Sequence, residues 1–158
     1  MSRPLQILLV EDSEDEAQLV LRELRKGGFT PEALRVESEP ELIDALQARS
    51  WQLVLSDYRL PGFDGMRALE LVRKHDTEVP VIMISGTMGE ELAVATMKAG
   101  AHDYVMKDAL ARLTPAVERE LREADRRREK RRAEDALRKS EEQYRELVEN
   151  ANSIILSL

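Results

Sequence analysis

The sequence predicts an α/β fold, in which a doubly wound, five-stranded parallel sheet is followed by a long C-terminal helix. Short apolar runs alternate with amphipathic helical patterns over residues 1–107, which predicts a mostly parallel sheet with helices on both faces. All seven glycines and five of the six prolines lie in that part. Between Ala116 and Asn150 there is neither glycine nor proline, which predicts one continuous helix of about 50 Å.

Each predicted strand is a short apolar run that ends at charged or turn-forming residues. The first begins after Pro4 and ends at an acidic pair, and the fourth is almost wholly apolar, as in strands buried on both faces. The second strand is the weakest, because only a short run supports it. The predicted strands are Leu5–Val10, Leu34–Val36, Trp51–Ser56, Pro80–Ile84 and Asp103–Val105.

Four helices are predicted between these strands, from apolar residues at helical spacing and from start and stop signals. Acidic residues, a proline or an aspartate cap mark their beginnings, and glycines mark two of their ends. In order, they are Glu14–Lys26 ended by Gly27 and Gly28, a helix that starts at Glu39 and Pro40, a helix capped by Asp64, and Glu90–Lys98 ended by Gly100.

The chain is acidic overall, with 24 basic and 31 acidic side chains and a net charge of −7 at pH 7. Residues 1–107 carry 12 basic and 19 acidic side chains, whereas residues 108–158 carry 12 of each. An acidic surface argues against direct nucleic-acid binding. The lack of cysteine excludes disulfides and thiolate chemistry. Without a signal peptide or an apolar run of about 18 residues, we expect a cytoplasmic protein with no membrane span.

Polar residues follow four of the predicted strands. Glu11 and Asp12 follow the first, Asp57 the third, Ser85 the fourth and Lys107 the last. Because the carboxyl ends of parallel strands meet at one edge of a sheet, we expect these side chains to converge there. Three carboxylates together are unfavourable unless a cation neutralises them, and an all-oxygen set favours Mg²⁺.

This combination of residue types suits phosphoryl transfer. An aspartate beside Mg²⁺ and a lysine can attack phosphorus and form an aspartyl phosphate, so Asp57 is a candidate nucleophile. Lys107 and Ser85 would then stabilise charge on the transferred phosphoryl oxygens.

Four stretches resemble the receiver domain of two-component response regulators: ILLVEDS (7–13), LVLSDYRLPGFDG (53–65), PVIMISG (80–86) and AGAHDYVMK (99–107). They occur in the family's order and span the whole compact part. The resemblance implies a flavodoxin-like fold with strand order 2-1-3-4-5. It also implies a phosphorelay partner, namely a histidine kinase or a phosphotransfer protein.

The resemblance assigns the metal site residue by residue. It implies that Asp57 is the phosphoacceptor, that Asp12 binds Mg²⁺ directly and that Glu11 acts through a water. The backbone carbonyl of Arg59 would complete the protein ligands. Glu11 stands where the family often has aspartate, a variant that should preserve metal binding.

The resemblance also assigns the residues around the phosphoryl group. Ser85 would donate a hydrogen bond to it, Lys107 would form an ion pair with it, and Tyr104 would be the aromatic switch residue. Asp108 stands where the family usually has a proline after the lysine.

Each of these residues also has a simpler structural explanation. Glu11 and Asp12 could cap the helix that follows them, and Asp57 could be an ordinary turn residue. Tyr104 alone is more often a core residue, and Lys107 alone is usually solvated. Because all of them fall in register with the predicted strands, a shared site is favoured over separate explanations.

We divide the chain into a receiver domain at 1–114, a signalling helix or coiled-coil linker at 115–149, and a segment at 150–158. Apolar residues at both ends of the helix form a seam interrupted by a basic run at 126–132. Two arrangements would explain this interrupted seam. The helix could form a parallel coiled coil with a stutter, or its two ends could pack while the stretch between them stays solvated. Charged flanks make this run a solvated face rather than a nucleic-acid or lipid site. The seam residues are Val117, Leu121, Ala124, Ala136, Ser140, Tyr144, Leu147 and Ala151.

The last stretch, SEEQYRELVENANSIILSL (140–158), resembles the opening of a PAS sensory domain. That resemblance implies a strand at Ile154–Leu156 and a chain that continues into a longer protein. By resemblance, receivers followed by PAS domains occur in sensor histidine kinases and in cyclic-di-GMP signalling proteins. The tail itself contains no phosphodonor histidine.

Two hypotheses of function follow, with a third weighed against them. The first is a receiver that takes a phosphoryl group onto Asp57 with Mg²⁺ and relays its state through a homodimeric C-terminal helix to an output domain. Such a receiver catalyses only its own phosphorylation and dephosphorylation. The second is a receiver-fold dimerisation module that needs no phosphorylation. An independent hydrolase would require a substrate pocket, of which the sequence shows no sign.

Overall fold

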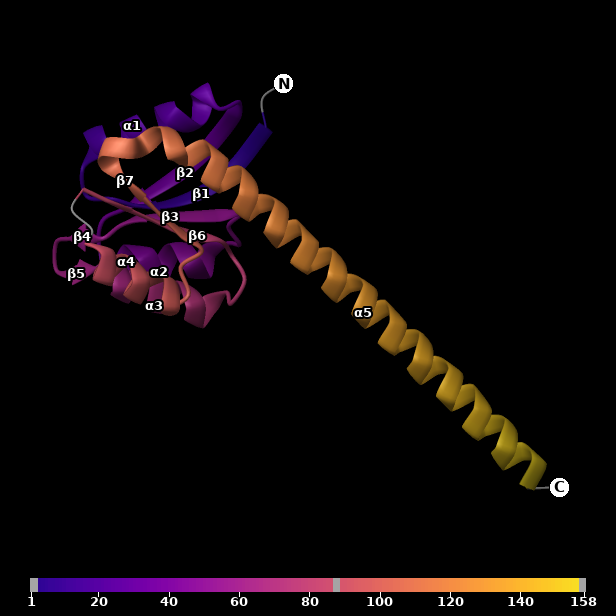
Figure 1. Ribbon diagram of the computed structural model, residues 1–158. Helices are drawn as coiled ribbons and strands as arrows, with labels where there is room; N and C mark the ends of the chain where they lie inside the picture. Colours follow the sequence, from indigo (N-terminus) through magenta and orange to yellow (C-terminus); the bar gives the residue numbers. More distant parts are fainter. Residues whose placement is uncertain (1–2, 87–88, 157–158) are drawn as a thin grey trace. The chain divides into compact units, whose positions relative to one another are not determined.

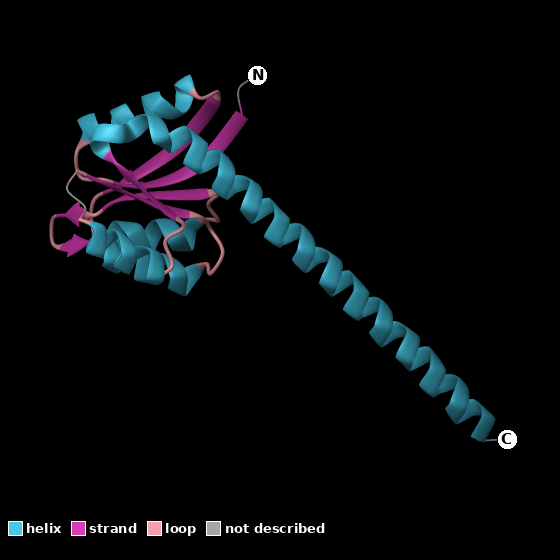
Figure 2. Cartoon of the chain, viewed as in Figure 1, coloured by secondary structure: helices cyan, strands magenta, loops and turns pink. Residues whose placement is uncertain are grey.

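The chain forms a five-stranded parallel sheet in the order β2-β1-β3-β6-β7, as seen in a computed structural model that describes residues 3–86 and 89–156 (Figures 1 and 2). Every neighbouring pair in the sheet runs parallel. Counting only the strands of this sheet, the order is the expected 2-1-3-4-5. The strands are β1 (Arg3–Val10), β2 (Phe29–Val36), β3 (Leu53–Asp57), β6 (Val81–Ser85) and β7 (Asp103–Met106).

Helices cover both faces of the sheet. Figure 1 shows α2, α3 and α4 below one face, with α1 and the beginning of α5 on the other. The predicted limits of the first and fourth helices are confirmed. The helices are α1 (Glu14–Lys26), α2 (Glu39–Ala48), α3 (Gly65–His75), α4 (Glu90–Lys98) and α5 (Leu113–Leu156), and a 3₁₀ segment, η1 (Lys107–Arg112), precedes α5.

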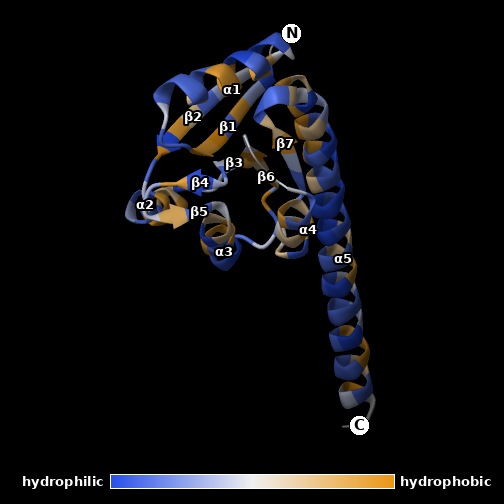
Figure 3. Ribbon diagram, turned by 60° about the vertical axis from the view of Figure 1, so that its left-hand side comes forward, coloured by the Kyte–Doolittle hydropathy of each residue, from blue (hydrophilic) through white to orange (hydrophobic). Residues whose placement is uncertain are grey.

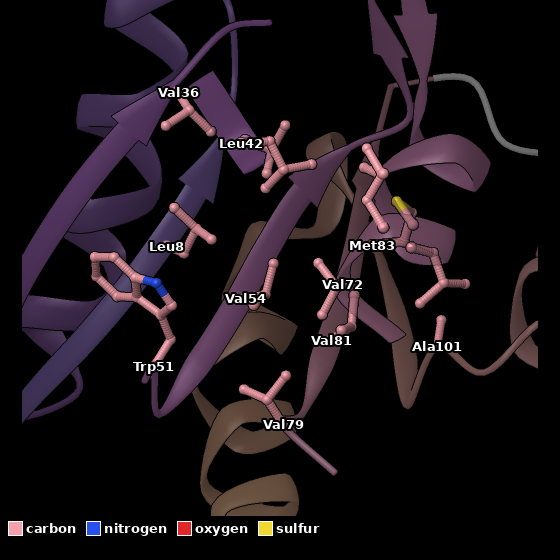
Figure 4. Close-up of a cluster of buried hydrophobic side chains, with 14 of the residues drawn as sticks. Leu8, Val36, Leu42, Trp51, Val54, Val72, Val79, Val81, Met83 and Ala101 are labelled. Atoms are coloured by element: carbon pink, nitrogen blue, oxygen red, sulfur yellow. The ribbon is translucent and has the colours of Figure 1, made fainter. Parts of the chain in front are cut away.

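Alternation along β1 divides the core into two clusters, one on each face of the sheet. Leu8 and Val10 contribute to the cluster under α2, α3 and α4, where Leu8, Val54 and Val81 from three strands lie together (Figure 4). Ile7 and Leu9 contribute to the cluster under α1 and the first turns of α5. Both faces of the strand are therefore buried, which explains its nearly unbroken apolar sequence.

Side-chain caps begin three of the helices. Ser13 Oγ accepts a hydrogen bond from the Glu16 backbone N–H at 3.2 Å, so Ser13 rather than Glu11 or Asp12 caps α1. Asp64 caps α3 as predicted, because its Oδ1 accepts from the Arg67 N–H at 2.9 Å. These bonds satisfy N–H groups that have no partner within the helix.

Local elements differ from the prediction at two places. The second strand is longer than predicted, since β2 pairs with β1 from Phe29 to Val36. It was underestimated because it lies at the sheet edge, where its exposed residues weaken the apolar signal. An unpredicted hairpin of β4 (Arg59–Leu60) and β5 (Phe63–Asp64) follows Asp57.

The C-terminal helix is continuous from Leu113 to Leu156 and contributes to two compact units, at residues 1–122 and 123–158. In the first unit Val117 is fully buried, and Leu121 packs against the same core cluster. The prediction that the seam includes these two residues is therefore wrong. They are covered by the α1 face of the sheet, which spacing along the helix could not reveal.

The prediction of a strand at Ile154–Leu156 is also wrong, because α5 runs through these residues. A strand requires hydrogen bonds from a neighbouring strand, whereas a helix satisfies its backbone within the segment. The PAS-like segment extends to residues 157–158, which lie outside the described residues.

Figure 3 shows that α5 is largely hydrophilic, with scattered apolar residues toward its C-terminal end. Across residues 3–86 and 89–156, we find no helix with both the length and the apolar character needed to span a bilayer.

Candidate functional site

Strand register brings the predicted site residues to one edge of the sheet. Val10 is level with Ser56, so Glu11, directly after β1, lies beside Asp57, the last residue of β3. Ser85 is level with Met106, which places it beside the strand that leads into Lys107.

Three carboxylates gather at this edge. Oxygen atoms of Glu11, Asp12 and Asp57 all lie within 4.8 Å of one another. Glu11 and Asp57 are 3% and 6% exposed, whereas Asp12 is open to solvent. Glu11 Oε1 accepts a hydrogen bond from the Ser13 N–H at 3.0 Å, and Asp57 Oδ1 accepts one from the Arg59 N–H at 3.4 Å. The two buried carboxylates are thus held by the backbone that follows them.

Lys107 is the cation of this cluster. Its Nζ donates a hydrogen bond to Asp57 Oδ2 at 3.0 Å and lies 3.9 Å from Glu11 Oε2. It also contacts Glu16 Oε2, from the first turn of α1. One ammonium therefore lies among three carboxylates from β1, α1 and β3.

Burial, hydrogen bonds and neighbouring charges shift two pKa values in this cluster. Burial raises the pKa of the Glu11 carboxyl to about 8, and the Asp57 charge adds to this, although the Ser13 hydrogen bond and Lys107 oppose it. Burial alone would lower the pKa of Lys107, but the hydrogen bonds to Glu16 and Asp57 outweigh burial, and the net shift is upward. The cluster thus retains an excess of negative charge and binds a proton readily.

This donor set fits a magnesium ion. Mg²⁺ prefers oxygen ligands and binds through one or two carboxylates while keeping several waters. Asp12 and Asp57 offer such oxygens at the edge of the sheet, and Glu11 is close enough to contribute through a water. A divalent cation would also stabilise the ionised form of Glu11, whose pKa is raised mainly by burial.

The remaining predicted residues lie around this cluster. Ser85 is 3% exposed at the end of β6, and Arg59 follows Asp57 at the beginning of β4. Tyr104, in the middle of β7, is half-buried against the core cluster of α2, α3 and α4. The structure therefore brings all the predicted site residues to one edge, with Tyr104 set back along its strand.

Two residues of this site were not recognised in the sequence. Glu16 is one of three acids in a helical first turn, and only its contact with Lys107 distinguishes it from the others. Gly65 donates its N–H to the Tyr58 carbonyl at 2.7 Å. A Cβ there would lie 2.9 Å from Tyr58 Cα, and no sequence pattern predicts that close approach.

The surface around Lys107 is shallow. A hollow of about 90 Å³ adjoins it, lined by Glu16, Leu19, Val20, Lys107 and Leu110. Pockets that enclose small-molecule substrates usually measure about 300–1,000 Å³. A larger hollow of about 670 Å³ lies along α3, away from the three carboxylates.

Known proteins are similar to this chain in sequence and in fold. A family profile describing the response regulator receiver domain matches residues 7–118. The nitrogen assimilation regulatory protein NtrX of Azorhizobium caulinodans is 37% identical over 126 residues, which are 78% of this chain and 27% of that protein. The C4-dicarboxylate transport regulator DctD of Pseudomonas aeruginosa is 34% identical over 65% of this chain and 22% of its own length. The chain thus spans about a quarter of the length of these relatives.

Solved structures agree with the sequence comparison. NtrX from Brucella abortus superposes with a TM-score of 0.71 and 32% identity, covering 80% of this chain and 29% of that one. A fusion that carries the trimeric coiled coil of yeast Spc42 superposes with a TM-score of 0.71 and 25% identity, covering 92% of this chain and 94% of that one. With the acidic edge, the strand order and the family profile in agreement, the chain belongs to the response regulator receiver domain family.

Proposed function

We propose that this chain is a phosphoacceptor module of a two-component phosphorelay, in which Asp57 takes a phosphoryl group from a histidine kinase or a phosphotransfer protein. The observation that supports this proposal most strongly is the position of the Asp57 carboxylate. It lies 3.0 Å from the Lys107 ammonium and within 4.8 Å of two further carboxylates. Nucleophile, cation and metal-binding oxygens are thus held together before a donor arrives.

The chemistry follows from this geometry. A carboxylate oxygen of Asp57 attacks the phosphorus of a phosphohistidine, forming the P–O bond as the P–N bond breaks, and the electron pair of that bond returns to the imidazole. Lys107 and the Ser85 hydroxyl would stabilise the phosphoryl oxygens. Asp12, Asp57 and the Arg59 carbonyl would hold Mg²⁺, with Glu11 contributing through a water, and the ion would supply further charge neutralisation.

The shallow surface favours a phosphoryl group presented by another protein. A hollow of about 90 Å³ beside Lys107 is too small to enclose most substrates, which argues against an independent hydrolase. A module that dimerises without phosphorylation remains the alternative, and the Asp57 experiment below separates the two.

The proposal extends to the remainder of the chain. We assign residues 1–114 to the receiver, 115–149 to a signalling helix that forms a homodimer, and 150–158 to the beginning of a PAS-like domain. We place the protein in the cytoplasm, and propose a sensor histidine kinase or a cyclic-di-GMP enzyme as the class of the whole protein.

We predict that Asp57→Asn abolishes labelling by a small acyl phosphate in the presence of Mg²⁺. Intact-mass spectrometry should show one phosphoryl group added to the wild type and none to the variant, because an amide is not nucleophilic enough to replace the carboxylate. Chelation of Mg²⁺ should suppress labelling of the wild type. Equal labelling of Asp57→Asn would place the acceptor elsewhere, and a wild type that is never labelled would favour the dimerisation module.

A further inference from the structure

Five large apolar side chains lie exposed on the described part of the second compact unit, and four of them follow one heptad repeat, with Val148 at the adjacent e position. Leu137, Tyr144, Leu147 and Ile154 are 61%, 71%, 68% and 66% exposed. Their spacing is seven, three and seven residues, which places Leu137 and Tyr144 at a positions and Leu147 and Ile154 at d positions of one heptad frame. Two smaller residues, at 140 and 151, complete the frame.

We propose that residues 137–154 form a two-stranded, parallel coiled coil with a second copy of this chain. A helix that packs on a globular surface usually carries a wide apolar stripe, whereas a strict a/d seam is narrow and matches another helix with the same repeat. A second copy of this chain presents that helix. The parallel orientation rests on the proposed function. In a parallel pair, the receivers of both copies are attached at the same, N-terminal end of the coiled coil.

The frame also defines where the seam begins. One heptad before Leu137, Lys130 takes an a position, and Arg126 takes the d position that precedes it. Charged residues at a and d oppose close packing, so the contact starts after them. The apolar residues nearer the receiver, such as Val117, already belong to its core. The seam is thus confined to the C-terminal part of α5.

The flanking positions tolerate a parallel pair. Among the residues at e and g positions between 136 and 150, one is charged, namely Glu141. In a parallel pair it faces Ala136 of the second copy, so no like charges meet. In a two-stranded coiled coil, the Tyr144 hydroxyl also stays at the solvent-exposed edge of the seam, whereas a bundle of more helices would bury it.

The contact is small. Burying these side chains against a second copy removes on the order of 1,000 Å² from water, below the roughly 1,200 Å² at which stable interfaces begin. The dimer is therefore weak, and it forms and dissociates as the concentration changes.

Sedimentation equilibrium of the full chain over a wide concentration range tests the seam. We expect a reversible dimer for the wild type and a dissociation constant at least about tenfold higher for Leu147→Glu. The matched control is Leu19→Glu, because Leu19 is 55% exposed on α1 outside the seam. A wild type that stays monomeric, a trimer, or equal weakening by both substitutions would overturn the proposal.

Cysteine cross-linking tests direction and register, and the absence of native cysteine makes a single introduced thiol unambiguous. Ser140→Cys, at a d position, should form a covalent dimer on oxidation at least about tenfold faster than Glu142→Cys, which points away from the seam. Equal rates would overturn the parallel register.

Failure of the seam is distinguishable from failure of the proposed function. Leu147→Glu should accept a phosphoryl group at Asp57 as the wild type does, because the site lies in the other compact unit. Loss of dimerisation with labelling retained supports the seam, and loss of labelling in this variant contradicts the separation of the two functions.

Discussion

Lys107 is the residue whose ammonium lies among three carboxylates of the site. Its ammonium contacts Asp57 at 3.0 Å and also contacts Glu16, which the family resemblance did not assign to the site. An incoming phosphoryl group carries negative charge and approaches the same ammonium. Glu16 therefore competes with the phosphoryl group for Lys107.

We predict that Glu16→Gln reacts with a small acyl phosphate about two- to tenfold faster than the wild type, because one carboxylate fewer repels the incoming anion. Stopped-flow measurement of the phosphorylation rate checks this. Asp15→Asn, on the same exposed turn, is the control and should leave the rate unchanged. A slower Glu16→Gln would mean that Glu16 helps to orient Lys107 instead.

Glu11 makes the stability of the metal-free protein depend on pH. Its pKa is about 8 when folded, against an ordinary value of 4.5, so the folded state binds more protons than the unfolded state between these pH values. Stability must then fall as the pH rises from about 4.5 to about 8. Above that range the buried carboxylate is ionised without a metal to neutralise it.

We predict that Glu11→Gln raises the free energy of unfolding in chelator at about pH 9 by about 1–3 kcal/mol and flattens its pH dependence. Denaturant unfolding at about pH 6 and pH 9 measures both effects. Glu32→Gln, exposed on β2, serves as the control. An unchanged slope in Glu11→Gln would assign the pH dependence to another group.

At the scale of elements, the start of α3 lies so close to the end of β3 that Gly65 has no space for a side chain. An added Cβ at Gly65 would lie 2.7 Å from Met83 Sδ, 2.9 Å from Tyr58 Cα and 3.2 Å from the Asp57 carbonyl oxygen. Two of these atoms belong to the backbone that positions the acceptor. The approach of α3 to β3 thus sets the geometry of the site.

We predict that Gly65→Ala destabilises the receiver by about 1–3 kcal/mol and slows phosphorylation, because the backbone at Asp57 must shift to relieve the overlap. Gly89→Ala is the matched control, since an added Cβ there meets nothing within 4 Å. It should change stability by less than about 1 kcal/mol. Equal losses in the two variants would contradict the steric explanation.

The first turns of α5 are joined to β7 by charge as well as by the core. Arg119 contacts the Asp103 carboxylate, and its Nε donates to Glu120 Oε1 at 3.2 Å. The charge of Asp103 raises the pKa of Arg119. Because Asp103 precedes Tyr104 on β7, any movement of this strand acts on the beginning of α5.

At the scale of the whole molecule, both core clusters lie within the first compact unit, since the last residues that pack in them are Met106 and Leu121. We predict that a chain ending at Arg122 unfolds within about 5 °C of the full chain and is phosphorylated at a similar rate, because both core clusters and all site residues are retained. Differential scanning calorimetry and labelling check this. A large loss of stability would show that residues after 122 support the receiver.

Local sequence was sufficient for much of the fold. The limits of α1 and α4 and the Asp64 cap were predicted correctly, because helix periodicity, capping residues and glycine stops act over a few neighbouring residues. The convergence of Glu11, Asp57 and Lys107 was also predictable, since parallel strands bring their carboxyl ends to one edge. Those predictions needed the order of the residues and no distant contact.

Other features required the tertiary structure, because they depend on what lies opposite a residue in space. The sequence alone shows Val117 and Leu147 as similar apolar positions on one helix, yet the first is buried against the sheet and the second is 68% exposed. Likewise, Ile154 appeared to be part of a strand until helix geometry placed it one heptad beyond Leu147. Glu16 and Gly65 belong to the site only because distant strands lie beside them. Sequence periodicity thus determined which residues form each element, and packing between elements decided which of their faces remain available to a partner.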